Sequence, residues 1–201
     1  MILRLLVSST VVGVAMAACS HAVRTAPAPM HPADSSRTSR VPMQVGRYRL
    51  TRRDWIRGTQ NDSAYHFTDG SPARVTVFLY AIPADVQVGP DSQSWTAREG
   101  KKFEEVQPLL VQQGVMDMYR LAFANSEHIT VGNRAIMEHA TAIAVRRSGS
   151  VAVDFQYLYL VAGQFLKIRA TVPSEGWERT DVPTFAREMA RRVATADTTR
   201  Q

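Results

Sequence analysis

Apolar and polar positions alternate with the period of a β-strand in two parts of the chain. Strands are predicted at 47–55, 63–70 and 73–82, and four more in the second half. These four cover residues 119–130, 134–147, 151–161 and 164–172. Between the two groups, apolar residues at near-helical spacing predict a helical region from about Ser94 to Met118, in which Pro108 must start a second helix or kink the first. The pattern predicts an α+β fold.

Two short turns set the register of the last three predicted strands. Ser148-Gly149 and Ala162-Gly163 are typical of two-residue hairpins. Pairing about them gives one face on which small residues flank aromatic ones, in the rows Ala142, Phe155, Ala170 and Ala140, Tyr157, Ile168. A last helix is predicted to cover this face, since apolar residues recur at amphipathic spacing at Val182, Phe185, Ala186, Met189 and Val193. Asp181 is placed to cap it.

The opposite face of these strands carries the candidate binding residues. Its rows are Ile143, Asp154, Thr171; Thr141, Gln156, Arg169; His139, Leu158, Lys167; and Met137, Leu160, Phe165. Two interpretations stay open: a solvent side partly covered by the central helical region, or a recognition surface. In the second, Arg169 and Lys167 meet carboxylates or phosphates and Phe165 anchors an apolar group. Thr141 and Gln156 belong to the same partner-binding set.

A doubled Glu-His pattern is the best remaining candidate for chemistry. Glu127-His128 and Glu138-His139 should lie on neighbouring strands. Depending on the turn, the two histidines are diagonal neighbours within reach of a shared metal, or face opposite ways. The register puts His139 in a row with Lys167, whose ammonium disfavours a cation, so ordinary strand histidines are expected. Motifs of hydrolases, zinc proteases, phosphate-binding loops and EF-hands are absent from the sequence. We therefore predict no catalytic residue, metal or other cofactor.

The first residues have the outline of a secretory signal. A short basic start, Met1 to Arg4, precedes an apolar stretch that ends at Ala18. This stretch has about fourteen residues, fewer than the roughly twenty of a membrane-spanning helix. The run Met16-Ala17-Ala18-Cys19 resembles the lipobox of bacterial lipoproteins, in which cleavage before the cysteine leaves its thiol to carry lipid. The alternative is an ordinary signal peptide that leaves an unpaired thiol.

The lipoprotein resemblance implies an organisation and a location. Lipidation would consume Cys19, the single cysteine, and several acyl chains would give a lasting membrane anchor. Ser20 then implies an outer-membrane position facing the periplasm, if the host is Gram-negative. The expected parts are a signal peptide at 1–18, lipidated Cys19 with a flexible tether at 19–43, one domain at 44–195 and a disordered tail at 196–201.

Charge excludes one class of partner. The formal net charge of +6 falls to +5 once Arg4 leaves with the signal, because Arg4 is the signal's one charged residue. This mild basicity is no nucleic-acid signature, and an exported lipoprotein rarely meets nucleic acid. The expected partners are the membrane, through the anchor, and an envelope protein or anionic ligand.

The order of predicted elements, over about 150 residues, resembles the PsbP-like fold, an antiparallel sheet flanked by helices. The resemblance is carried most clearly by VDFQYLYLVAGQFLKIRATVP and the closing helix. Members are mostly non-catalytic, which implies an accessory or binding module for another envelope component. Two other classes remain: a carrier or sensor of a small amphiphile held between the sheet and the central helical region, and a hydrolase or metalloenzyme without a recognisable motif.

Overall fold

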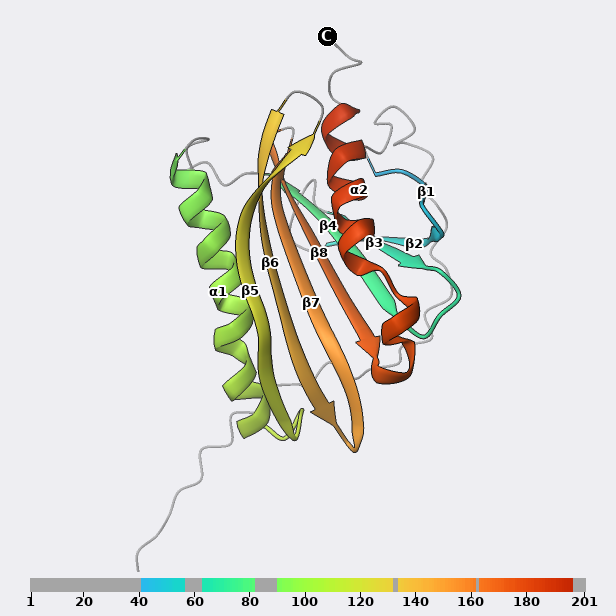
Figure 1. Cartoon of the computed structure of the whole chain (residues 1–201), viewed down its shortest axis with the longest axis vertical. Coiled ribbons are helices and arrows are strands. Elements are labelled where there is room, and N and C mark those ends of the chain that lie inside the picture. The colour runs from blue at the N-terminus through green and yellow to red at the C-terminus, as the bar shows by residue number, and fades with distance from the viewer. Residues whose placement is uncertain (1–40, 57–62, 82–89, 132–133, 162, 197–201) are drawn as a thin grey trace, which may run out of the picture. The chain divides into compact units, whose positions relative to one another are not determined.

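In the computed structural model of the chain, residues 41–56, 63–81, 90–131, 134–161 and 163–196 are described. They form one antiparallel sheet in the order β1-β2-β3-β4-β8-β7-β6-β5 (Figure 1). Its strands are β1 (Gln44–Val45), β2 (Tyr48–Trp55), β3 (Ser63–Thr68), β4 (Arg74–Ala81), β5 (Met118–Val131), β6 (Arg134–Arg147), β7 (Ser150–Val161) and β8 (Gln164–Pro173). The helices are α1 (Pro90–Gln112), the 3-10 helix η2 (Ser174–Arg179) and α2 (Val182–Thr195).

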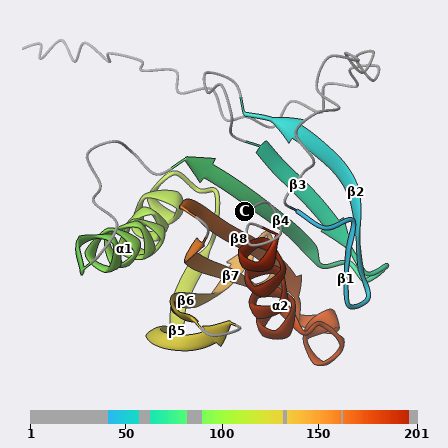
Figure 2. The same cartoon turned by 90° about the horizontal axis from the view of Figure 1, so that it is seen from above.

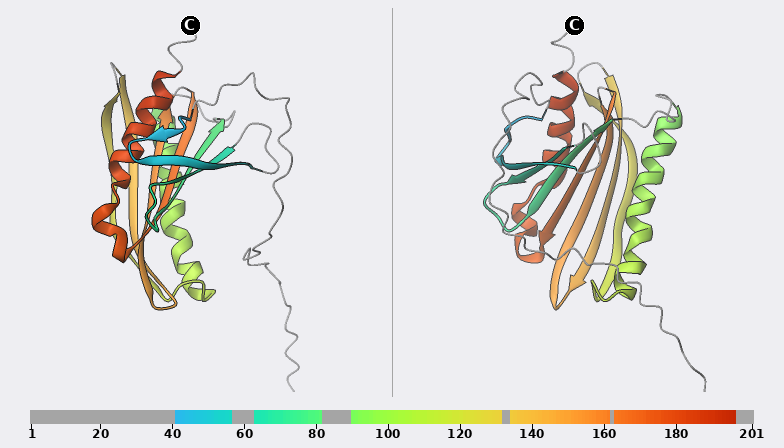
Figure 3. Two further views of the ribbon diagram at one scale, coloured as in Figure 1. Left: turned by 90° about the vertical axis from the view of Figure 1, so that its right-hand side faces the viewer. Right: turned by 180° about the vertical axis from the view of Figure 1, so that it is seen from behind.

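The two long helices lie on opposite faces of the sheet, as Figures 2 and 3 show. The predicted α+β class, an antiparallel sheet flanked by helices, is confirmed. The predicted register is also confirmed, since Ala142 pairs with Phe155 and Phe155 with Ala170. Ser148 and Gly149 both have left-handed backbone, with φ of 48° and 83°, which is the conformation that a type I′ turn requires. Ala162 lies outside the described residues.

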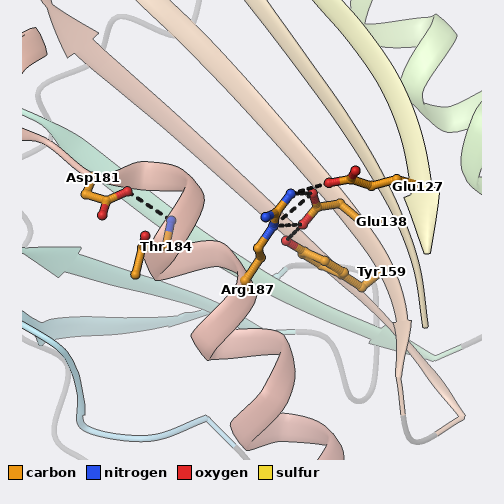
Figure 4. Close-up of polar contacts among 6 residues, drawn as sticks. All are labelled: Glu127, Glu138, Tyr159, Asp181, Thr184 and Arg187. Atoms are coloured by element: carbon orange, nitrogen blue, oxygen red, sulfur yellow. Dashed lines mark hydrogen bonds and ion pairs between the residues drawn. The ribbon is translucent and has the colours of Figure 1, made fainter. Parts of the chain in front are cut away.

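The main core lies between the sheet and α2. The predicted apolar stripe of α2 is buried, and the ring of Phe185 packs 4.6 Å from that of Tyr48 and 5.3 Å from that of Phe67. The side chain of Asp181 accepts a hydrogen bond of 3.0 Å from the backbone N–H of Thr184, as the capping prediction requires (Figure 4). Helix α2 lies over β7 and also contacts β1, β5 and β8.

The central helix differs from its predicted bounds. One helix runs through Pro108 and ends at Gln112, so no second helix starts there. Gly114 ends it in left-handed backbone, with φ of 68°, and donates a hydrogen bond of 3.0 Å to the carbonyl of Val111. The chain then turns so that Met118 begins β5, whereas the sequence pattern placed Met118 at the end of the helical region.

The predicted signal at 1–18, Cys19 and most of the tether lie outside the described residues, as do residues 197–201 of the tail. Val41, which the sequence pattern assigned to the tether, is 2% exposed and packs in the main core. Among the described helices, none combines the length and apolar character needed to cross a membrane.

Candidate functional site

Helix α1 covers part of the predicted binding face. It lies against β5, β6 and β7, where Phe103 packs with Met116, Ile143 and Val145. Thr141 and Gln156 are fully buried, and Phe165 is 1% exposed. These three side chains are therefore covered in the fold, and the more accessible members of the predicted set are Lys167 and Arg169 on β8.

Arg169 is the exposed member of the predicted set. Its Nε donates a hydrogen bond of 3.3 Å to Oε1 of Gln156, as the predicted row requires. Its guanidinium carbon lies 5.3 Å from the ring centroid of Phe103, a cation–π distance. The guanidinium is therefore held beside Phe103 of α1.

Lys167 is half-buried between two apolar neighbours, Phe78 on β4 and Leu158 on β7. Burial, and after it the nearby charges of Arg169 and Lys102, lower the pKa of its ammonium to about 8, while the charge of Glu99 opposes them. Among the described residues, neither Lys167 nor Arg169 forms an ion pair.

Asp154, a carboxylate on the same strand face, forms no ion pair with either cation. Asp154 forms an ion pair with Arg147 and accepts a hydrogen bond of 2.8 Å from the hydroxyl of Thr171. The register thus brings together the whole predicted set and leaves Lys167 and Arg169 without an ion pair among the described residues, while the charge of Glu99 compensates Lys167 only in part. Partner binding by the set stays a prediction.

The two histidines are diagonal neighbours on one face, because His128 pairs with Met137 and His139 with Ser126. His139 is nearly buried, its Nδ1 lies 2.6 Å from the hydroxyl of Ser126, and burial lowers its pKa. The Cα of Gly100 on α1 approaches the other edge of the ring. The described residues hold no cluster of three or more metal-ligating side chains, which leaves the histidine pair without the further ligands of a metal site.

Glu127 and Glu138 belong instead to a polar cluster on the opposite face, beneath α2 (Figure 4). Nε and Nη2 of Arg187 donate to both carboxylate oxygens of buried Glu138, at 2.8–3.2 Å, and Nη2 also contacts Glu127. The hydroxyl of Tyr159 donates to Glu138 at 2.6 Å. Burial raises the pKa of Tyr159, and the charge of Glu138 raises it further. We name this cluster of Arg187, Glu127, Glu138 and Tyr159 the Arg187 clasp; it ties α2 to β5, β6 and β7.

Sequence reasoning missed the Arg187 clasp, although one signal was present. Glu127 and Glu138 lie directly opposite each other on paired strands, and like charges in that position repel unless a cation lies between them. The amphipathic pattern of the last helix places Arg187 beside its buried stripe. The two facts together predict the contact once the β5–β6 register is known.

A hollow on the α2 face was also missed. It has a volume of about 940 Å³ and lies where η2 passes into α2, with Phe123, Phe155, Trp177 and Arg179 among its lining residues. The rings of Phe155 and Trp177 lie 5.8 Å apart, and Trp177 is 48% exposed. Its walls come from β5, β7 and η2, which the sequence pattern gave no reason to bring together.

No protein-family model matches the chain. No curated protein matches it either. Among solved structures, it resembles the solution structure of cyanobacterial PsbP (CyanoP) from Synechocystis sp. PCC 6803, with 14% sequence identity and a TM-score of 0.44, over 71% of this chain and 83% of that chain. PsbP is the family whose element order the sequence resembles. A likeness of this size says nothing about what the present chain binds.

Proposed function

We propose that the chain is a non-catalytic, membrane-anchored accessory protein of the cell envelope that binds another envelope component through an anionic group. One observation carries the proposal: Lys167 and Arg169 lie on the same face of β8 and, among the described residues, neither has an ion-pair partner.

The charge of Lys167 costs the fold stability. Burial disfavours the charged form of Lys167, and Arg169 adds repulsion, which together lower its pKa to about 8. A neutral side chain at position 167 would keep the packing against Phe78 without this cost. A carboxylate or phosphate bound between Lys167 and Arg169 would offset it, because a guanidinium offers paired donors to either anion.

The envelope location rests on the lipobox-like run that ends at Cys19. Lipid on Cys19 would hold the domain at a membrane surface, and the residues up to Val41 would serve as its tether. Together with the cation pair, this supports a partner that is itself fixed in the envelope, at the outer membrane if the host is Gram-negative.

The aromatic hollow on the α2 face favours a second candidate function, a carrier of a small amphiphile. Phe155 and Trp177, with ring planes tilted by 35°, provide an apolar surface, and Arg179 is an exposed cation at its side. The space between the sheet and α1, where such a ligand was expected, is occupied by the packing around Phe103. Quenching of tryptophan fluorescence by an anionic amphiphile, lost both in Trp177→Phe and in Arg179→Gln, would support the carrier.

The accessory function is tested by neutralising the cation pair. Lys167→Gln with Arg169→Gln should leave unfolding cooperative, yet remove the component that copurifies with the wild-type protein from native membranes. The matched control is Arg191→Gln with Arg192→Gln, which removes the same charge from exposed positions on α2.

Capture should weaken as salt rises, because salt screens the attraction between the two cations and an anionic group, above all at exposed Arg169. The proposal fails if the double variant at 167 and 169 retains the component that the wild type captures, or if the control pair loses it equally.

A further inference from the structure

β5 forms one free edge of the sheet. It is 14 residues long, is last in the strand order, and among the described strands pairs with β6 alone. Every residue from Met118 to His128 is exposed, on both faces of the strand. In Figure 2, β5 lies at the end of the sheet, with α1 and α2 to either side of it. Its outer backbone groups are therefore accessible.

The first half of β5 is unusually apolar for an exposed edge. Met118 is 49% exposed, Tyr119 38%, Leu121 44% and Phe123 41%. An edge strand leaves the N–H and C=O groups of every second residue unpaired. Edges are usually protected by Lys, Pro or short length, and β5 has neither residue and is long.

We propose that β5 pairs with β5 of a second copy of this chain, antiparallel about a two-fold axis, to give one continuous sheet. An axis perpendicular to the sheet keeps both α2 faces on the same side. In an antiparallel pair, opposite residues then share a face. The pairing is isologous, so each contact occurs twice.

Charge selects the register. Arg120 and Glu127 both lie on the α2 face, since they pair with Ala144 and Glu138 of β6. One antiparallel register places Arg120 opposite Glu127 of the second copy, and the same register places Met118 opposite Ile129. The side chain of Glu127 is 44% exposed, so it can accept a second guanidinium besides Arg187. A shift of two residues in either direction loses both Arg120 contacts.

The bulge of β5 agrees with this register. The pairing with β6 shifts by one residue between Leu121 and Phe123, so Ala122 is the extra residue. We also leave Ala122 unpaired in the pairing between the two copies. Leu121 then faces Ser126 of the second copy, and Phe123 faces Asn125. Ala124 then faces itself on the two-fold axis, and every residue keeps the face it has in the single chain.

The first test is the oligomeric state of the full-length chain by analytical ultracentrifugation. We expect a monomer–dimer equilibrium whose dissociation constant rises about tenfold or more in Arg120→Glu, because two attractive pairs become two repulsive ones. Arg49→Glu, an exposed charge reversal on β2 at the other end of the sheet, is the matched control and should not change it. A wild type that stays monomeric at all concentrations overturns the proposal.

The second test is the register. Ala124→Cys should form an intermolecular disulfide under mild oxidation, because the two residues face each other across the axis at a distance that a disulfide spans. Ser126→Cys is the control on the same face, opposite Leu121, and the unsubstituted chain with Cys19 is the blank. Equal cross-linking of the two variants, or none in either, overturns the pairing. If the chain is a monomer whose β5 pairs with a strand of a different protein, the proposed pairing with a second copy is wrong.

Discussion

The pKa of Lys167 differs from that of an ordinary surface lysine. This difference predicts that the free energy of unfolding depends on pH. Its pKa of about 8 in the fold lies below the usual 10.5, so between these values the unfolded chain binds the proton and the folded chain does not. The free energy of unfolding should therefore gain a contribution that rises from pH 8 to pH 10.5. Lys167→Met should remove that contribution.

Denaturant unfolding of wild type and variant across this pH range measures the difference. Lys101→Met, on the exposed side of α1, is the matched control. Parallel stability curves for wild type and Lys167→Met would show that the ammonium is not held in the apolar setting described above.

Arg187 and Arg191 make contrasting contacts from one helix. Arg187 neutralises a carboxylate whose side chain is 2% exposed, whereas Arg191 pairs with Glu188 at the surface. Arg187→Ala leaves buried Glu138 without its cation and should cost about 2–3 kcal/mol of unfolding free energy. Arg191→Ala should cost at most about 0.5 kcal/mol. Equal thermal or denaturant midpoints for the two variants would contradict the clasp.

Helix α1 contains Gly100, whose replacement by Ala should destabilise the protein although Ala has the higher helix propensity. An exposed Gly→Ala change within a helix usually stabilises by about 1 kcal/mol. At Gly100 the added Cβ would overlap the ring of His139, and such overpacking costs about 1–3 kcal/mol. Gly100→Ala should therefore lower the unfolding midpoint.

His139→Ala provides the internal check. It opens the space that the methyl group needs, so the variant with both changes should be more stable than Gly100→Ala alone. If adding His139→Ala to Gly100→Ala gives no recovery, the close approach of α1 to β6 is not the cause.

The strands and their register could be predicted from sequence, because tight turns such as Ser148-Gly149 fix which residues face each other. The end of α1 could not be placed, since Val115, Met116 and Met118 continue an apolar pattern past the glycine that ends the helix. For the site, the row Thr141, Gln156, Arg169 was found from strand pairing alone. Its coverage by α1 was one of two interpretations that stayed open, because periodicity does not say which strands a helix crosses. The hollow beside Trp177 depends on η2, which carries no periodic signal.

At the scale of the whole molecule, the proposed anchor makes the location of the protein depend on one atom, the thiol sulfur of Cys19. In the native host, Cys19→Ala should move the protein from the membrane fraction to the soluble fraction, because the acyl chains have no other attachment point. Fractionation with immunodetection measures this, and mass spectrometry of the wild-type N-terminus identifies the lipid. Unchanged membrane retention together with an unlipidated wild type would refute the anchor.

The strand order also has a consequence for how the chain folds. β4 and β8 are neighbours in the sheet, although α1 and three strands separate them in sequence. Strands β1 to β4 are synthesised first and can pair only among themselves, so the outer edge of β4 waits for β8. Closing so large a loop is slow, since its entropy is lost before the new contacts compensate. Until then Val75, Val77 and Leu79 are uncovered on an open edge, and this interval is the one in which the chain is most prone to aggregate.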